Sequence, residues 1–248
     1  MSKISRKIRF LGISNRESVN YLKLAFLEFF LLIIGILIAL QVNNWNEQRK
    51  KENLKQTYVS ALITDLEEDI RNIQDAMTLF ESQIDDMNVM RERLISEYAT
   101  ADTLLAISVN EAEFGMPPFV TYNLNTFLTM QSTGNIDLLR FETIERMRSI
   151  HRLHDQELYY RNGNMDILKA LLTDYLNLAP MPYSMLSGSR LMQNALTSID
   201  KDELTILLNN YFTMKMFALS NSIHFYELIK DESHLLIELM QETEKRGW

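Results

Sequence analysis

Two groups of ionisable side chains in this sequence have the types and spacing that could support chemistry. Glu28 lies inside an apolar run, where a carboxylate can act as a proton-relay group. His151 and His154 are three residues apart and close to Asp155 and Glu157, so on a helix both imidazoles could face one metal ion. Each group also has a simpler interpretation, and the surrounding sequence favours it.

Glu28 lies only about four residues inside the apolar run, near one end of it. A glutamate at that depth can extend to the membrane surface, pair with Lys23 or hydrogen-bond a neighbouring helix. We therefore favour a tolerated interfacial glutamate over a proton relay.

The histidines do not complete a known metal pattern. A di-metal site in a helical bundle needs Glu-x-x-His on two helices, and the nearest stretches are Asp231-x-x-His234 and the reversed His224-x-x-Glu227. The chain has no cysteine, no Gly-x-Ser-x-Gly and no phosphate or dinucleotide loop. We predict no metal, no cofactor and no catalytic residue, so the protein is predicted not to be an enzyme.

The apolar run is long enough to cross a membrane. Leu24 to Val42 is nineteen residues, or roughly 28 Å of helix, close to the thickness of a bilayer core. A charged Glu28 costs less than the ~2.5–3.5 kcal/mol of a mid-membrane carboxylate, and the Leu, Ile and Phe residues of 29–40 return roughly 3–6 kcal/mol. Residues 24–42 are predicted to form a transmembrane helix, with Gly35 and Ala39 as a weak small-residue face for helix pairing.

The flanking residues predict an uncleaved signal anchor and its orientation. Tyr21 and Trp45 occupy the positions of interfacial aromatic residues, and 41–44 offers no small-x-small cleavage site. The arm of residues 1–23 carries six basic residues, which favours a cytoplasmic N-terminus in a bacterial inner membrane. Residues 43–248 would then form a periplasmic domain.

Charge is distributed unevenly, and the distribution argues against nucleic acid as a partner. Residues 1–24 carry a net charge of +5, whereas the chain as a whole carries −8. An acidic domain lacks the basic face that phosphate binding needs, while the basic arm suits an anionic membrane surface.

The rest of the chain is predicted to be helical. Residues 36–114 contain no glycine or proline, and apolar residues follow a heptad seam through 59–98 that Arg91 interrupts. We expect a long helix over about 47–99, a connector over 100–120, and helices over about 123–132, 141–178 and 201–244. The fold class is therefore all-α: one N-terminal transmembrane helix that continues into a long helix of an antiparallel bundle. Packing of the seam within the chain is favoured over a coiled coil with another copy.

Thr133, Gly134 and Asn135 form a possible interaction motif between two predicted helices. Free amides at a helix end can bind a ligand, but a left-handed cap at Gly134 alone explains the sequence. We favour the capping role.

Two stretches resemble an uncharacterised family of single-span membrane proteins common in Bacteroidota. The first is Glu28 to Glu47, E-x-x-x-L-x-x-G-I-L-I-A-L-Q-V-N-N-W-N-E, which contains the membrane motif residues Glu28, Gly35, Ala39, Gln41, Asn43, Asn44 and Trp45. The second is Asn125 to Leu139. The resemblance implies a domain of unknown function held at a membrane, with no assigned catalytic residue.

The sequence is compatible with three functions. The first is a non-enzymatic, membrane-anchored scaffold that binds a protein partner or a second copy of itself. The second is a sensory or regulatory subunit that binds a ligand in the outer bundle. The third is an accessory of an ion-driven transport or motor complex that uses Glu28.

Overall fold

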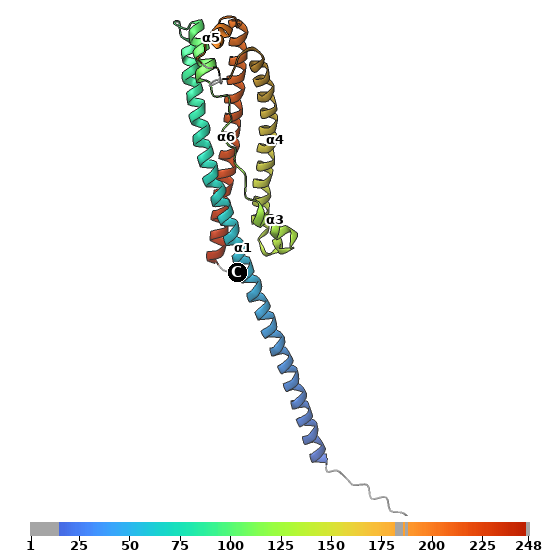
Figure 1. The fold of residues 1–248 in the computed structure, drawn as a ribbon. Coiled ribbons are helices and arrows are strands. Elements are labelled where there is room, and N and C mark those ends of the chain that lie inside the picture. Colours follow the sequence, from blue (N-terminus) through green and yellow to red (C-terminus); the bar gives the residue numbers. More distant parts are fainter. Residues whose placement is uncertain (1–14, 182–185, 187, 247–248) are drawn as a thin grey trace, which may run out of the picture. The chain divides into compact units, whose positions relative to one another are not determined.

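The protein is all-helical in a computed structural model that describes residues 15–181, 186 and 188–246. No strand occurs in this part of the chain, so the predicted fold class is confirmed. The helices are drawn in Figure 1 and are α1 (Asn15–Ile95), α2 (Ala101–Ala106), η1 (Ile107–Glu111), α3 (Asn125–Ser132), η2 (Asn135–Leu138), α4 (Phe141–Leu178), α5 (Arg190–Thr197) and α6 (Lys201–Arg246).

The chain divides into two compact units, residues 1–56 and 57–248, and α1 contributes to both. Of the predicted cytoplasmic arm, residues 1–14 lie outside the described residues. Residues 15–23 belong to the backbone of α1, and the side chain of Tyr21 is not among those described. Within the first unit, α1 passes through Gly35 without interruption because no proline occurs there.

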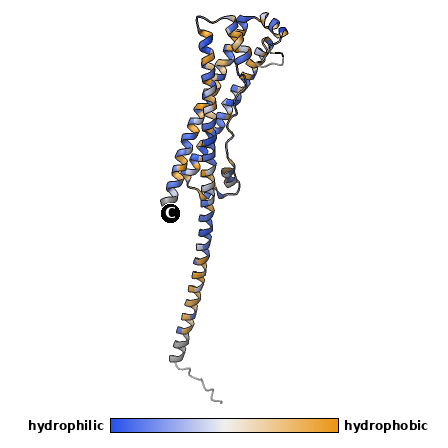
Figure 2. Cartoon of the chain, turned by 60° about the vertical axis from the view of Figure 1, so that its left-hand side comes forward, coloured by the Kyte–Doolittle hydropathy of each residue, from blue (hydrophilic) through white to orange (hydrophobic). Residues whose placement is uncertain are grey.

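The first unit contains a segment long and apolar enough to cross a membrane. Ile34 is partly buried, and the other side chains of residues 24–42 are all exposed. Figure 2 shows this segment of α1 as a run of apolar residues followed by hydrophilic turns. The structure therefore contains a candidate membrane span where the sequence predicted one.

The second unit is a helical bundle built on the C-terminal part of α1, α4 and α6 (Figure 1). The α1 seam packs into the same core as α6, and Phe80 and Tyr226 bring their ring centroids to 5.7 Å. This confirms the prediction that the seam packs within the chain. The buried seam residues are Val59, Leu62, Leu66, Ile70, Ile73, Phe80 and Met87.

The predicted connector over 100–120 is more structured than expected. Thr100 and Thr103 form a capping box in which each side chain bonds the other's backbone, and this box starts α2. A π-helical turn, η1, follows α2. Residues 112–124, here called the strap, contain no helix or strand, and Figure 1 shows them running beside the bundle towards α3.

Local hydrogen bonds set the other helix ends. The Ser96 hydroxyl accepts from the Tyr98 amide at 3.2 Å, which offers the backbone an alternative to the helix and ends α1 at Ile95. Asp200 caps α6, since its Oδ1 accepts from the Asp202 and Glu203 amides. Gly134 has a φ of 72°, the left-handed conformation predicted for it after α3.

Candidate functional site

The paired histidines on α4 are part of the core of the bundle. His154 is buried and stacks on Tyr122, with ring centroids 3.7 Å apart and planes 4° apart. His151 lies against Phe127. Burial lowers the pKa of His154 to about 3, so its imidazole is neutral at pH 7.

The acidic neighbours of these histidines do not complete a metal site. Asp155 is exposed, whereas Glu157 is buried and directed into the bundle. Among the described residues, no group of three His, Cys, Asp or Glu side chains is placed to hold a metal ion. The geometry matches the interpretation of His154 as a core histidine.

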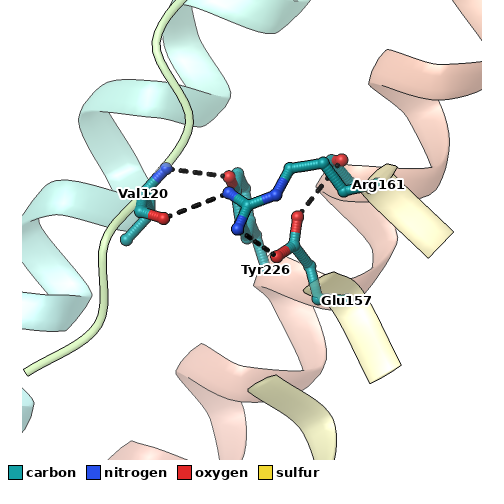
Figure 3. A network of polar contacts seen from close by, with 5 residues as sticks. Val120, Glu157, Arg161 and Tyr226 are labelled. Carbon is teal, nitrogen blue, oxygen red and sulfur yellow. Dashed lines mark hydrogen bonds and ion pairs between the residues drawn. The ribbon is translucent and has the colours of Figure 1, made fainter. Parts of the chain in front are cut away.

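Glu157 belongs to a buried polar network that holds the strap. Arg161 donates to the Val120 carbonyl at 3.2 Å, and the Val120 amide donates to the Tyr226 hydroxyl at 3.1 Å (Figure 3). Glu157 lies 3.6 Å from Arg161 and accepts a hydrogen bond from Ser222. Burial raises the pKa of Glu157, and the charge of Arg161 opposes that rise.

The same kind of contact recurs along the strap. The Lys215 ammonium donates to the carbonyls of Glu113 and Gly115 at 2.7 and 2.6 Å. Tyr211 donates to the Phe114 carbonyl, and Asp69 accepts from the Asn123 amide at 2.9 Å.

These contacts give the buried ionisable groups a structural role. The strap has no helical or sheet partner for its main chain, and a buried peptide group left without a hydrogen bond is costly. Side chains from α1, α4 and α6 supply the missing donors and acceptors. This role was not predicted from the sequence. Lys215 did carry a signal for it, because it is a lysine at a position of the α6 pattern, between Tyr211 and Ala218, where an apolar residue is expected.

A cavity of about 660 Å³ lies between α1, α2 and α6 in the second unit. Its walls come from the last turns of α1, the α1–α2 junction, Leu104 of α2 and the first turns of α6. This volume is typical of small-molecule sites. One of the residues that line the cavity is Arg91, which interrupts the heptad seam of α1.

The predicted membrane motif residues are all exposed: Glu28, Gly35, Ala39, Gln41, Asn43, Asn44 and Trp45. Among the described residues Glu28 has no ion pair with Lys23, because a separation of five residues places the two on different faces of a helix. Asn43 donates to Glu47 at 3.1 Å, and the guanidinium of Arg49 lies 5.9 Å from the Trp45 ring centroid. A Cβ added at Gly35 would contact nothing within 4 Å. The small-residue face is thus open within this chain.

Thr133, Gly134 and Asn135 form hydrogen bonds within the chain. The Thr133 hydroxyl donates to the Thr129 carbonyl at 2.7 Å, and the Asn135 amide group donates to Tyr58 and to Thr133. These bonds join the end of α3 to the seam helix α1. Their geometry agrees with capping.

Over the part of the chain that the structure describes, the fold and these sites define an all-helical protein with one candidate membrane span and a helical bundle. The chain belongs to DUF6090, a family of unknown function, whose sequence profile matches residues 28–176. That range begins at Glu28 and runs through the strap into α4. Comparison with curated proteins and with solved structures gives no match.

Proposed function

We propose that this protein is a membrane-anchored, non-enzymatic interaction module. Residues 24–42 cross a bacterial inner membrane once, with the N-terminus in the cytoplasm and the bundle in the periplasm. The bundle then recognises a protein partner or a second copy of the chain.

The observation that carries the proposal is the exposure of apolar side chains in residues 24–42. Phe26 is 72 % exposed, and Phe29 and Leu31 are 61 % and 60 % exposed. An apolar surface of this extent is unfavourable in water and favourable in lipid. The buried ionisable groups of the bundle bind the strap, which supports a role without catalysis.

An apolar stripe on α6 supports recognition of a protein. Ile206, Phe217, Leu228 and Leu235 are 40–59 % exposed, and their separations of eleven and seven residues keep them on one face of the helix. Aromatic and aliphatic side chains on one exposed face are typical of contact surfaces between proteins. The stripe therefore offers a surface for the partner.

Membrane anchoring and orientation can be tested with single cysteines, because the natural chain has none. We expect the chain to remain in the membrane after carbonate extraction. A cysteine at Thr78, on the exposed side of α1, should react with an impermeant maleimide from the periplasm, and one at Ser5 should not. Release by carbonate, or the reverse labelling pattern, would contradict the proposal.

Partner recognition can be tested with a photo-crosslinking amino acid at Phe217. His234 is the matched control, because it is exposed on α6 about 100° around the helix from Phe217. We expect a discrete crosslinked product in membranes from Phe217 and none from His234. Monomer alone from both positions would count against an interaction module.

The cavity favours a second function, binding of a small molecule by the bundle. Its volume, and its lining of apolar residues with a few polar side chains, are typical of small-molecule binding sites. In this function the bundle is a ligand-binding subunit with a sensory or regulatory role. Calorimetric titration of the full-length protein with ligands of defined chemistry tests this function.

A further inference from the structure

The cavity between α1, α2 and α6 has an apolar floor. Met87, Leu104, Leu208 and Phe212 line it, and each is less than 10 % exposed. These side chains come from three helices that belong to the packed core. The floor therefore offers an apolar surface to a ligand in the cavity.

The rim of the cavity is polar and carries an unpaired cation. Arg91 lines the cavity and is exposed, and its guanidinium makes no hydrogen bond or ion pair with any described residue. It occupies the seam position between Met87 and Leu94, where the heptad pattern otherwise places an apolar residue. Thr205, Asn209 and Thr213 of α6 also line the cavity.

The other charged groups in the lining leave Arg91 available. The Lys201 ammonium already donates to the carbonyls of Leu196 and Ile199, at 2.7 and 2.8 Å. Asp202 is the one carboxylate among the lining residues, and no ion pair joins it to Arg91. Two cationic side chains against one carboxylate give the lining a positive balance.

We propose that this cavity binds an amphipathic carboxylate, a free acid with an aliphatic tail of medium length. The tail lies on the floor formed by Met87, Leu104, Leu208 and Phe212. The carboxylate pairs with the Arg91 guanidinium, whose planar fork matches two carboxylate oxygens. This inference rests on the ligand-binding function proposed above and is independent of the membrane anchor.

The chemistry of the cavity favours an amphipathic carboxylate over three related classes of ligand. A neutral alcohol with the same tail would leave the guanidinium without its charged partner, and a quaternary ammonium would be repelled by Arg91. A fully polar anion would gain nothing from the floor, which contributes by burying apolar surface. The unbranched, adaptable side chains of Met87 and Met216 tolerate tails of different shape.

The test uses the full chain in lipid nanodiscs and calorimetric titration with octanoate, octan-1-ol and octyltrimethylammonium, with empty nanodiscs subtracted. We expect octanoate to bind at least tenfold more tightly than the other two compounds. Arg91→Gln should weaken octanoate about tenfold or more, since a charge-assisted hydrogen bond is lost. Arg71→Gln, an exposed arginine on α1 outside the cavity lining, should leave the affinity unchanged.

A second pair of variants locates the binding site. Thr213→Trp fills the rim and should abolish octanoate binding, while Ser220→Trp, exposed on α6 away from the lining, should not change it. The inference is overturned by a wild-type chain that does not bind octanoate, by equal affinity for octanol, or by an unchanged Arg91→Gln. A chain that resists carbonate and crosslinks at Phe217 but ignores octanoate would overturn this inference and leave the interaction module intact.

Discussion

Two segments of the same helix, α1, use apolar residues in opposite ways. Residues 24–42 are apolar on every side and exposed almost throughout. Residues 59–87 are apolar at heptad positions only, and those positions are buried in the core of the bundle while the intervening residues are largely polar. The difference indicates that the two segments are adapted to different surroundings, because an all-round apolar helix belongs in lipid and a one-sided helix belongs on a core.

Glu28 and Asp69, one carboxylate from each segment, also differ in their exposure and in their hydrogen bonds. Glu28 has no intramolecular partner among the described residues and lies on an exposed surface. Asp69 is 2 % exposed and accepts hydrogen bonds from the Asn123 amide with both oxygens. In the bundle, the buried Asp69 carboxylate has a structural role, because it accepts the hydrogen bond of a main-chain amide of the strap.

The largest expected effect comes from breaking the apolar segment. Ile33→Arg together with Leu37→Arg adds about 5–7 kcal/mol to the cost of insertion, which matches or exceeds the roughly 3–6 kcal/mol that residues 29–40 return. We expect the chain to appear in the soluble or aggregated fraction after carbonate extraction. Glu47→Arg, in the polar turns that follow, is the control and should stay in the membrane. Retention of the double variant would show that residues 24–42 do not span the bilayer.

A smaller effect is expected when the same residue type is truncated in each of the two segments of α1. Ile73 is fully buried and Ile36 is 53 % exposed, although both lie on α1. Ile73→Ala should lower the free energy of unfolding of the bundle by about 2–5 kcal/mol, because it removes buried methyl groups and leaves a cavity. Ile36→Ala should leave that free energy unchanged. Thermal unfolding followed by circular dichroism measures both, and equal effects would contradict the division of α1.

Periodicity and a glycine cap were enough to predict the long helices from the sequence. The absence of glycine and proline predicted the long helix, and the alternation of four- and three-residue steps predicted which face of it is buried. Gly134 was predicted as a cap because its signal is local. The start of α2 was missed because threonine stands at Thr103, where the usual capping box has Glu or Gln.

The contacts of the strap and the cavity could not be predicted in the same way. Lys215 bonds the Glu113 carbonyl across 102 residues of sequence, and no local pattern fixes such a pair. Arg91 was visible as an interruption of the seam, but the space beside it depends on where α2 and α6 pass. Local signals therefore predict elements, whereas the sites arise from packing between distant elements.

The pH dependence of stability provides a smaller effect. Desolvation by burial raises the pKa of Asp69 from its ordinary 3.8 to about 6, opposed by the Asn123 amide and assisted by the charges of Asp65 and Glu68. Between pH 4 and 6 the folded state therefore binds more protons than the unfolded state, so this group makes stability fall as pH rises through that window. The contribution is at most about 3 kcal/mol.

Asp69→Asn isolates this contribution, because the amide oxygen can still accept from Asn123 but does not titrate. We expect the unfolding free energy of the wild type, relative to the variant, to fall from pH 4 to pH 6.5 in urea titrations. A difference that rises with pH over that range would mean that the hydrogen bond from Asn123 outweighs burial.

The smallest effect is expected at Glu28. Glu28→Gln removes one charge about four residues inside the apolar segment, where its cost is well below the ~2.5–3.5 kcal/mol of a charge at the membrane centre. An anchor should therefore tolerate the change, and the carbonate-resistant fraction should stay the same or rise slightly. An ion-driven role predicts a different pattern: Glu28→Gln would remain in the membrane but fail to complement a deletion strain, and Glu28→Asp would restore complementation. Only an ion-driven role requires a carboxylate at this position, because an anchor needs no more than an apolar segment of sufficient length.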